Sequence, residues 1–417
     1  MTMSSERNWA ENLTYGAARI ARPESVGALR KMLARGGSVR ALGTRHCFND
    51  IADTDGTLVS LERLPHDVEI DGDVARISGG ARYGDIALDL HTSGRALANL
   101  ASLPHISVAG AVATGTHGSG DRTPSLAAAV RALTFATASG DLVTLRRGDA
   151  DFAGAVVHLG SLGIVTELEL ETEPAYDVAQ TVFDAPRWDR ILEDVDGVTS
   201  LGDSVSIFTT WREPDHADQL WVKTRAGREI DLARVAALGA RAADGPRHPI
   251  PGVAPDACGA QGGISGPWYE QLPHFRLDFT PSVGAELQSE YLLPRADAAA
   301  AIEAVRGIAD RISPHLHICE IRTIAADDLW LSPSNGRDSV GLHFTWHHDE
   351  PAVREILPIL EAALDPFDAR PHWGKLFTMD PARIRALYPQ WDDFRDLRKR
   401  IDPSGRFQNA YTRRLGL

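Results

Sequence analysis

Apolar and polar residues alternate over short runs in residues 1–176, which predicts β-strands mixed with short helices. Residues 161–176 (SLGIVTELELETEPAY) alternate from Ile164 to Leu170, as a half-exposed strand does. Residues 25–37 (SVGALRKMLARGG) place apolar residues at helical spacing and end at two glycines. Short strands and helices without regular βαβ spacing indicate an α+β fold rather than a doubly wound sheet.

A second pattern runs from residue 177 to residue 375, where longer alternating segments carry polar residues at every second position. These segments are 204–211 (SVSIFTTW), 275–282 (FRLDFTPS), 287–294 (LQSEYLLP), 317–324 (HICEIRTI) and 340–348 (VGLHFTWHH). Helical patterns at 296–312 and 351–364 are interleaved with them. We therefore predict an antiparallel sheet with helices on one face, which leaves the other face free to carry a site.

Three of the alternating segments carry a polar pair two residues apart, so each pair points to one face of its strand. The pairs are Gln288 with Glu290, Glu320 with Arg322, and His343 with Thr345. A solvent-facing sheet is the alternative interpretation of any single pair. Glu320 and Arg322 lie in an otherwise apolar run, however, where an unpaired buried charge would cost several kcal/mol. A floor of such groups suits a polyol, because each hydroxyl both donates and accepts hydrogen bonds.

The overall charge and hydropathy exclude several partners. The net charge is -14 and no long Lys/Arg block occurs, so we expect neither nucleic acid nor an anionic membrane surface as a partner. No apolar run approaches the roughly 18 residues of a membrane span. The first residues, MTMSSERNWAENLTYG, lack the apolar core of a secretory signal. These features predict a cytoplasmic protein.

The sequence gives little support for a metal site or for a hydrolase motif. The three cysteines, Cys47, Cys258 and Cys319, are far apart, which favours neither a disulfide framework nor a zinc ribbon. Residues 347–350 (HHDE) suggest a metal cluster, but adjacent histidines on a strand point to opposite faces, so we interpret them as a solvated loop. Residues 262–266 (GGISG) lack the spacing of a serine nucleophile elbow. We predict no metal.

Residues 101–120 (ASLPHISVAGAVATGTHGSG) interleave four glycines with Ala, Ser and Thr. Such small side chains let the backbone approach a ligand, and successive N–H groups can then hold a pyrophosphate. The dinucleotide fingerprint G-x-G-x-x-G is present only loosely, and no phosphate-binding G-x-x-x-x-G-K-[ST] occurs. A tightly packed loop remains the alternative. Upstream, GTRHCFND (43–50) leads from a glycine into His46, which by itself fits a metal ligand, a base, a core side chain or a less usual role.

The order and spacing of these motifs resemble a known family. GTRHCFND (43–50), ASLPHISVAGAVATGTHGSG (101–120) and SLGIVTELEL (161–170) resemble the FAD-binding domain of the vanillyl-alcohol-oxidase-type flavoproteins. Within that superfamily HICEIRTI (317–324), HFTW (343–346) and RPHWGK (370–375) resemble the alditol (xylitol) oxidases. The resemblance implies a two-domain α+β protein. Its FAD-binding domain is split between residues 1–176 and 376–417, and residues 177–375 form a substrate-binding (cap) domain with an antiparallel sheet.

The resemblance also implies which residues hold FAD, most of them through backbone N–H groups. They are Ala41, Leu42, Gly43, Thr44, Arg45, His46, Ser107, Gly110, Ala113, Thr114, Gly115, Thr116, His117, Ile164, Val165, His372 and Asn409. His46 is implied to be the covalent anchor, bonded from a ring nitrogen to the flavin 8α-methyl carbon. Neutral imidazole is nucleophilic, which fits that bond. Arg45 and Cys47 stand where some relatives carry a smaller glycine and serine.

By the same resemblance, a second set of residues lines the alditol site. They are Ser102, Gln288, Glu320, Arg322, His343, Thr345 and Lys375. We expect the terminal primary alcohol of a polyol such as xylitol or sorbitol to be oxidised to the aldose, with the hydride passing to flavin N5 and O2 reduced to H2O2.

Four members of this set, Glu320, Arg322, His343 and Lys375, are the candidate catalytic residues. Lys375, helped by Arg322, is the candidate cation for the negative charge of the reduced flavin. His343 is the candidate proton acceptor because its ordinary pKa, about 6.5, lies nearest neutrality. Lys375 is the alternative acceptor if burial lowers its pKa.

Two other functions stay open. An aldonolactone (gulonolactone-type) oxidase or dehydrogenase would share the glycine-rich loop, the Glu-x-Arg pair and the lysine after His-Trp. The contexts of Gln288 and Thr345 favour the alditol. A non-catalytic flavin-binding protein is the other alternative, and the intact set of Glu320, Arg322 and Lys375 argues against it. The sequence does not define the oligomeric state and is compatible with a monomer.

Overall fold

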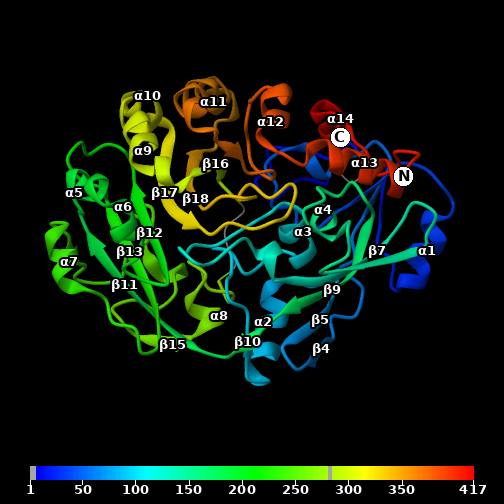
Figure 1. The fold of residues 1–417 in the computed structure, drawn as a ribbon, viewed down its shortest axis with the longest axis horizontal. Helices are drawn as coiled ribbons and strands as arrows, with labels where there is room; N and C mark the ends of the chain where they lie inside the picture. The colour runs from blue at the N-terminus through cyan, green and yellow to red at the C-terminus, as the bar shows by residue number, and fades with distance from the viewer. Residues whose placement is uncertain (1–5, 280–283) are drawn as a thin grey trace.

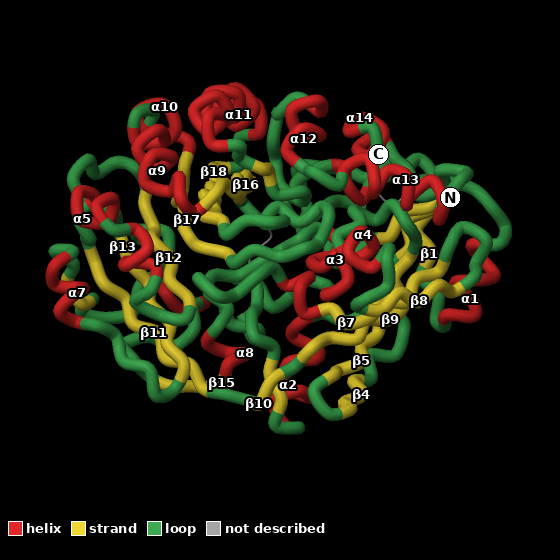
Figure 2. The backbone as a smooth tube through the Cα atoms, viewed as in Figure 1, coloured by secondary structure: helices red, strands yellow, loops and turns green. Residues whose placement is uncertain are grey.

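The computed structural model describes residues 6–279 and 284–417, and it divides into two strand-rich halves (Figure 1). Strands β4, β5, β7 and β9 lie in one half, and β11, β12, β13, β17 and β18 lie in the other. Helices and strands are mixed along the chain (Figure 2). Most strand pairs are antiparallel. The α+β class predicted from the sequence is confirmed.

The first half is built on a three-stranded parallel sheet and a five-stranded antiparallel sheet. The parallel sheet has the order β1-β3-β2, with β1 Arg19–Ala21, β2 Val39–Ala41 and β3 Thr57–Val59. The antiparallel sheet has the order β4-β5-β9-β7-β8, with β4 Val68–Asp71, β5 Val74–Ser78, β7 Val130–Ala136, β8 Leu142–Arg146 and β9 Ile164–Glu171. Its helices are α1 Val26–Leu33, α2 Tyr83–Thr92, α3 Val108–Ala113 and α4 Phe152–Val156. This half also contains a short antiparallel pair of strands, β6 Arg95–Ala96 and β10 Glu173–Pro174.

The second half is built on a nine-stranded sheet. Its strands are β11 Asp177–Asp184, β12 Ser204–Thr209, β13 Gln219–Arg225, β14 Arg241–Ala242, β15 Ser265–Pro267, β16 Glu286–Pro294, β17 Leu316–Ile324, β18 Ser339–His347 and β19 Arg370–Pro371. Its helices are α5 Trp188–Glu193, α6 Val195–Thr199, α7 Leu232–Ala237, α8 Trp268–Gln271, α9 Ala298–Arg306, α10 Ala309–Ile312 and α11 Glu350–Leu364.

The central strands of this sheet present two chemically different faces. Alternate residues such as Cys319, Ile321 and Phe344 are buried in one hydrophobic cluster with residues of α9 and α11. The residues between them point to the opposite face, because successive side chains of a strand alternate. The helices therefore cover the apolar face, as the sequence pattern predicts, and the polar positions of β16, β17 and β18 are left on the other.

The chain returns to the first half at its C-terminus. Helices α12 Pro381–Leu387, α13 Trp391–Ile401 and α14 Ala410–Leu415 follow the large sheet. Ile384, Phe394 and Tyr411 from these helices share a buried cluster with Ala75 and Leu168 of the five-stranded sheet. The C-terminal segment thus packs in the core of the first half. The boundaries 1–176, 177–375 and 376–417 themselves stay a prediction.

One predicted strand is wrong. Residues 275–282 were expected to form a strand, but within the described part Phe275 makes only an isolated bridge with Cys258, and residues 276–279 form no strand, with a turn at 277–278. The backbone N–H of Phe275 donates to Ser102 O and that of Arg276 donates to Ala257 O. Neighbouring loops therefore occupy the hydrogen-bonding groups that a sheet partner would need. Residues 280–282 lie outside the described residues. None of the helices in the described part has the length and apolar character needed to cross a membrane.

Candidate active site

A cavity of about 920 Å³ is lined by loops of the first half and by the polar face of the large sheet. Its volume lies toward the upper end of the range of small-molecule and cofactor sites, which runs to roughly 1,000 Å³. One wall is formed by residues 41–48 and by most of residues 105–117, and the floor by residues of β16, β17 and β18. The two sequence regions with candidate chemistry therefore face the same space.

The two glycine-containing loops are held together at close range. The backbone N–H of Ser107 donates to Thr44 Oγ1 over 3.0 Å. A Cβ on Gly43 would lie 2.5 Å from Ser107 Oγ, and one on Gly110 would lie 2.6 Å from the same atom. These contacts leave no room for side chains while the Ser107 hydroxyl keeps its position. The loops can therefore present bare backbone to a ligand, as a pyrophosphate requires.

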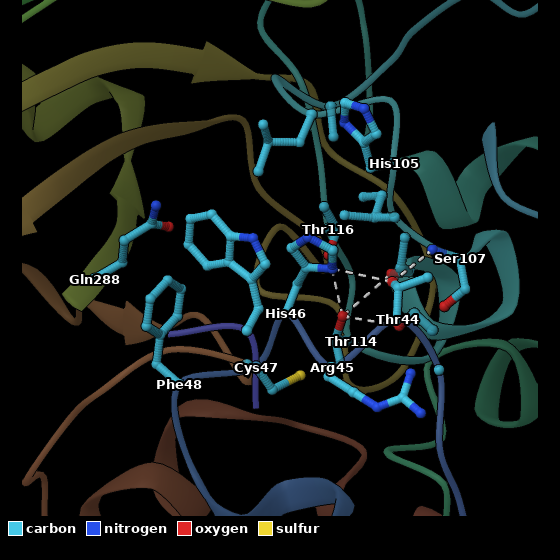
Figure 3. Close-up of a pocket in the computed structure, with 18 of the residues that line it drawn as sticks. Thr44, Arg45, His46, Cys47, Phe48, His105, Ser107, Thr114, Thr116 and Gln288 are labelled. Atoms are coloured by element: carbon cyan, nitrogen blue, oxygen red, sulfur yellow. Dashed lines mark hydrogen bonds between the residues drawn. The ribbon is translucent and has the colours of Figure 1, made fainter. Parts of the chain in front are cut away.

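His46 points into the cavity from the first loop. In Figure 3 its ring lies between Phe48 and Gln288 on one side and Thr44 and Ser107 on the other. The ring stacks on Trp9 with a centroid distance of 5.4 Å, and Nδ1 lies 3.1 Å from Thr44 Oγ1. Burial lowers the pKa of His46 to about 4, so the imidazole is neutral at physiological pH. A neutral ring is the form that has a free nucleophilic nitrogen.

Most residues predicted to bind the cofactor line this cavity. They are Ala41, Leu42, Gly43, Thr44, Arg45, His46, Ser107, Gly110, Ala113, Thr114, Thr116, His117, Ile164, Val165 and His372. Gly115 and Asn409 do not line it. Gly115 has a φ of 64°, and a Cβ there would lie 2.9 Å from the Pro333 ring, so its role is to turn the chain.

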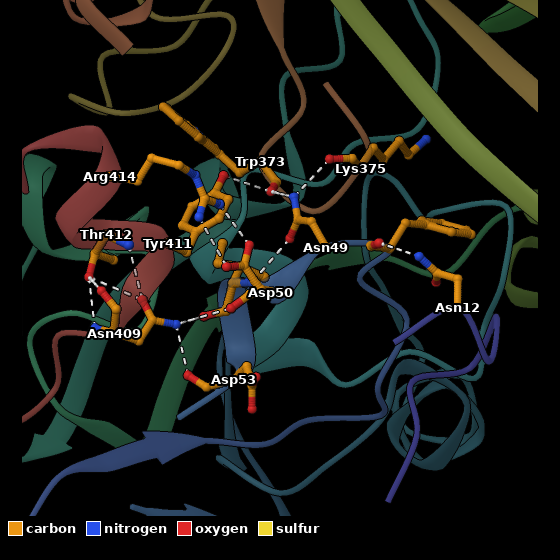
Figure 4. A network of polar contacts seen from close by, with 12 residues as sticks. Asn12, Asn49, Asp50, Asp53, Trp373, Lys375, Asn409, Tyr411, Thr412 and Arg414 are labelled. Atoms are coloured by element: carbon orange, nitrogen blue, oxygen red, sulfur yellow. Dashed lines mark hydrogen bonds and ion pairs between the residues drawn. The ribbon is translucent and has the colours of Figure 1, made fainter. Parts of the chain in front are cut away.

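Asn409 anchors the C-terminal helix instead. Its side-chain oxygen accepts from the Thr412 backbone N–H as the N-cap of α14. Its Nδ2 lies 2.8 to 3.1 Å from the carbonyl oxygens of Asp50, Ile51 and Asp53 (Figure 4). These bonds tie α14 to the segment that follows the first loop. Asn409 therefore supports the position of the loop without reaching the cavity.

The two unusual neighbours of His46 have separate surroundings. Arg45 adopts a left-handed backbone (φ 67°) and its side chain pairs with Glu6. Cys47 lies beside Gly374, where an added Cβ would be 3.1 Å from Sγ. Burial raises the pKa of the Cys47 thiol to about 11. The thiol is thus protonated near neutrality and is a poor nucleophile, because thiolate is the reactive form.

The register of the large sheet brings the predicted polar pairs into two rows on the cavity floor. Gln288 of β16 is opposite Thr345 of β18. In the next row Glu290 of β16 and Glu320 of β17 are opposite His343, one on each side. Ser102, Arg322 and Lys375 also line the cavity. The structure thus gathers all seven residues predicted for the alditol site around one space.

Glu290 connects two cations on this floor. Lys375 Nζ donates to Glu290 Oε2 over 2.7 Å and Arg322 donates to Oε1 over 2.9 Å. His117 Nε2 lies 3.3 Å from the same Oε1. Lys375 and Arg322 hold the pKa of Glu290 well below its usual value despite complete burial. The sequence pattern paired Glu290 with Gln288 but did not include it among the site residues.

His343 lines the cavity floor beside Glu320. Its Nδ1 is 3.5 Å from Glu320 Oε2, while its buried Nε2 has no hydrogen-bond partner among the described residues. Burial, and next the Lys375 cation, lower the pKa of His343 to about 4. Lys375 is also buried, which lowers its pKa, but the adjacent Glu290 opposes that shift. His343 is therefore neutral near pH 7, the form in which Nε2 carries a lone pair, although the lowered pKa makes the ring a weaker base than an ordinary histidine.

Two residues near the floor were missed by the sequence interpretation. His274 lines the cavity and its Nε2 lies 3.0 Å from Glu320 Oε1. Lys223 of β13 is 2% exposed and lies behind His274. A lysine inside the otherwise apolar QLWVKTR was the available signal for Lys223, because a buried charge needs partners. His274 sits in a loop that no pattern predicts.

His347, from the HHDE segment considered for a metal, contacts another histidine instead. His347 Nδ1 lies 3.1 Å from His317 Nε2, and their ring centroids are 3.9 Å apart. Over residues 6–279 and 284–417 no group of three or more His, Cys, Asp or Glu side chains could hold a metal ion.

The wall of the cavity fits an FAD. Its bare-backbone loops suit the pyrophosphate, and the neutral His46 ring suits attachment of the flavin. Gly79 also lines this space, with room for only a hydrogen: an added Cβ would lie 2.0 Å from Val165 O. The cavity therefore depends on small residues along its length.

Comparison with known proteins agrees with this site. The family model of the FAD binding domain matches residues 17–146, and that of D-arabinono-1,4-lactone oxidase matches residues 285–415. An alditol oxidase of Streptomyces sp. is 49% identical over 416 residues, which cover 98% of each chain. An L-gulono-1,4-lactone dehydrogenase of Mycobacterium tuberculosis is 30% identical over 439 residues, again covering 98% of each. A cholesterol oxidase from B. sterolicum shares the fold, with a TM-score of 0.75 at 15% identity over 98% of this chain and 96% of that chain.

Identity of 49% over nearly the whole length is the strongest of these likenesses. It covers both the glycine-rich loops and the polar floor, and the fold is shared with a cholesterol oxidase. The chain belongs to the alditol oxidases of the vanillyl-alcohol-oxidase type of FAD-dependent oxidoreductases.

Proposed function

We propose that this enzyme oxidises the terminal primary alcohol of alditols such as xylitol and sorbitol to the aldose, with O2 as electron acceptor. The observation that carries the proposal is the row Glu290–His343–Glu320 on the cavity floor, where a neutral imidazole, whose Nε2 has no hydrogen-bond partner among the described residues, lies among hydrogen-bonding groups. Alternating donors and acceptors suit a chain of hydroxyls better than a hydrophobic substrate.

The floor residues have two proposed roles, substrate binding and proton transfer. Glu320, Arg322 and Thr345 bind hydroxyl groups, together with Gln288 and Ser102. Glu320 accepts hydrogen bonds from a hydroxyl and Arg322 donates to one, while Thr345 does either. FAD, when bound, supplies the hydride acceptor at flavin N5 and passes the electrons on to O2, which becomes H2O2.

His343 is the proposed proton acceptor at the reacting hydroxyl. Its Nε2 has no hydrogen-bond partner among the residues that the structure describes, whereas the Nζ of Lys375, the other candidate, donates to Glu290 over 2.7 Å. Lys375 is therefore held as a cation whose charge is balanced by a carboxylate. It supplies positive potential at the floor, where negative charge develops during oxidation. Lys375 thus acts electrostatically and His343 acts as the base.

We also propose that His46 carries FAD covalently through the 8α carbon. The neutral ring, its position at the cavity wall and the resemblance of the GTRHCFND loop support this. Acid-precipitated protein should keep its yellow colour after washing, and His46→Ala should release the flavin to the supernatant. A colourless pellet from the unmodified protein would remove the covalent bond and leave FAD binding intact.

An aldonolactone is the second candidate substrate, because the D-arabinono-1,4-lactone oxidase model matches residues 285–415, which include the floor strands. A substrate panel in an oxygen electrode separates the two. We expect xylitol or sorbitol to drive oxygen uptake with matching peroxide, and L-gulono-1,4-lactone to be slower. A lactone oxidised much faster than every alditol would overturn the proposal.

A pair of variants tests the base. His343→Gln should lower kcat by about 10²–10⁴-fold, the usual contribution of a general base. His347→Gln is the matched control on the same strand, because His347 contacts His317 rather than the floor residues. If both variants keep wild-type kcat, His343 is not the base.

A further inference from the structure

A buried lysine, Lys223, lies behind the cavity floor and contacts His274, a buried histidine that lines the cavity. Lys223 Nζ lies 2.5 Å from Leu272 O, 3.1 Å from Pro273 O and 3.4 Å from His274 Nδ1. An ammonium group has three donors and these three acceptors match them. The match explains how a lysine side chain is tolerated at 2% exposure.

The contacts of His274 define which nitrogen carries its proton. Its Nε2 faces Glu320 Oε1 at 3.0 Å, and an ionised carboxylate can only accept. Nε2 must therefore be the N–H, and Nδ1 keeps the lone pair that faces the Lys223 ammonium. Burial, and next the charge of Lys223, lower the pKa of His274, which agrees with a neutral ring. The charged groups that act on His274 are Lys223 from β13 and Glu320 and Arg322 from β17.

The carboxylate of Glu320 is in turn held by hydrogen bonds to one of its two oxygens. Its Oε1 accepts from Ser206 Oγ over 2.7 Å as well as from His274. Its Oε2 is left to face His343 Nδ1 at 3.5 Å and Arg322 at 3.6 Å. With Nδ1 of His343 directed at this carboxylate oxygen, the proton of the neutral ring resides on Nδ1 and Nε2 is free. One row of contacts thus runs from Lys223 through His274 and Glu320 to the ring of His343, which lines the cavity.

We propose that Lys223 and His274 are positioning residues: the ammonium group fixes the His274 tautomer that donates to Glu320, and the carboxylate so held keeps the proton of neutral His343 on Nδ1, which leaves the Nε2 lone pair for the reacting hydroxyl. The inference rests on the proposed role of His343 as base. Burial lowers the pKa of Lys223 to about 7, so the three-donor ammonium form is present at and below neutral pH.

The test compares His274→Leu with His274→Gln in the flavin-loaded enzyme, with xylitol as substrate. Leucine removes the donor, whereas the glutamine amide can still donate to Glu320. Without the donor, Glu320 becomes a stronger acceptor and stabilises the protonated form of His343. We expect His274→Leu to lower kcat about tenfold and to move the acid limb of kcat/KM upward by about one pH unit, within the range that one neighbouring interaction shifts a pKa. His274→Gln should restore both values to near wild type.

Two further variants keep the result interpretable. Lys223→Met removes the ammonium and should move the acid limb in the same direction by a smaller amount. Ser289→Ala is the control, because it deletes a buried hydrogen bond to Trp346 on the opposite face of the same sheet and should leave the pH profile unchanged. If His274→Leu does not accumulate as folded enzyme, Lys223→Met and His274→Gln carry the test.

The outcomes are distinct. The inference is overturned if the acid limb of kcat/KM stays at its wild-type position in His274→Leu. If His274→Leu does not fold, an unchanged acid limb in Lys223→Met overturns it. So does a His274→Gln enzyme as impaired as the leucine variant. A wild-type enzyme that does not oxidise any alditol contradicts the proposed function instead, and the same profiles can then be measured with the substrate that reduces the flavin.

Discussion

Replacing Glu290 by glutamine should destabilise the protein, because this carboxylate balances two buried cations. Lys375 Nζ lies 2.7 Å and Arg322 lies 2.9 Å from its two oxygens, and all three side chains are at most 12% exposed. Removing one partner of a buried pair costs about 3–5 kcal/mol, since the remaining charge stays desolvated. Glutamine keeps one acceptor oxygen, so we expect a loss near the lower bound, about 3 kcal/mol.

The pH dependence of this loss has a definite sign. The folded-state pKa of Glu290 is depressed well below its ordinary 4.5. Its stabilisation is therefore fully present above pH 4.5 and is lost as the pH falls through the lower folded-state pKa. The difference between wild type and Glu290→Gln should be constant from neutral pH down to about 4.5 and shrink below it.

The assay is urea unfolding of the flavin-loaded protein followed by circular dichroism. Glu286→Gln is the matched control on the same strand. Glu286 accepts from Gln288 over 2.6 Å, and burial raises its pKa rather than lowering it, so neutralising it should cost less than about 1 kcal/mol. A Glu290→Gln protein as stable as wild type, or two variants with equal losses, would refute the assignment of Glu290 as the balancing anion.

Three other measurements follow from the same structure. The acid limb of kcat/KM should lie near pH 4. His343 must be neutral to accept the proton, and it is neutral above its pKa of about 4 and protonated below it. An acid limb near the ordinary histidine pKa of about 6.5 would contradict this. Asn409→Ala should lower the free energy of unfolding by about 2 kcal/mol through loss of the α14 cap. The flavin content of that variant should be retained, and its loss would return Asn409 to the cofactor site. Gly79→Ala should reduce flavin content and stability together, because its Cβ would lie 2.0 Å from Val165 O; wild-type values for both would show that the backbone there can shift.

Side-chain periodicity explains why much of the floor could be predicted. Glu320 and Arg322 share a face because alternate residues of a strand must, and the apolar residues between them specify which face meets the helices. The order of the strands is not contained in this periodicity. That Glu290 and Glu320 flank the same histidine follows from β18 lying between β16 and β17, a tertiary fact set by packing across many residues.

The errors and omissions have similar physical origins. The residues around Phe275 alternate between apolar and polar, as in a strand. The backbone N–H of Phe275 nevertheless donates to the Ser102 carbonyl of a loop, because tertiary contacts take the place of a neighbouring strand. His274 has no periodic context, and its importance arises from contacts with Lys223 and Glu320, which lie 51 and 46 positions away in sequence. Asn409 was assigned to the cofactor although a local role, capping a helix start, accounts for it.

Anaerobic reduction of the bound flavin tests the central claim most directly, because it detects the alcohol as electron donor whatever the acceptor. The enzyme is mixed with xylitol, sorbitol or L-gulono-1,4-lactone without oxygen, and loss of the flavin's visible absorbance is followed in time. We predict rapid bleaching by an alditol, slower bleaching by the lactone, and an alditol rate reduced about 10²-fold or more in His343→Gln. Faster bleaching by the lactone, or an unchanged rate in His343→Gln, would contradict an alditol site built around this histidine.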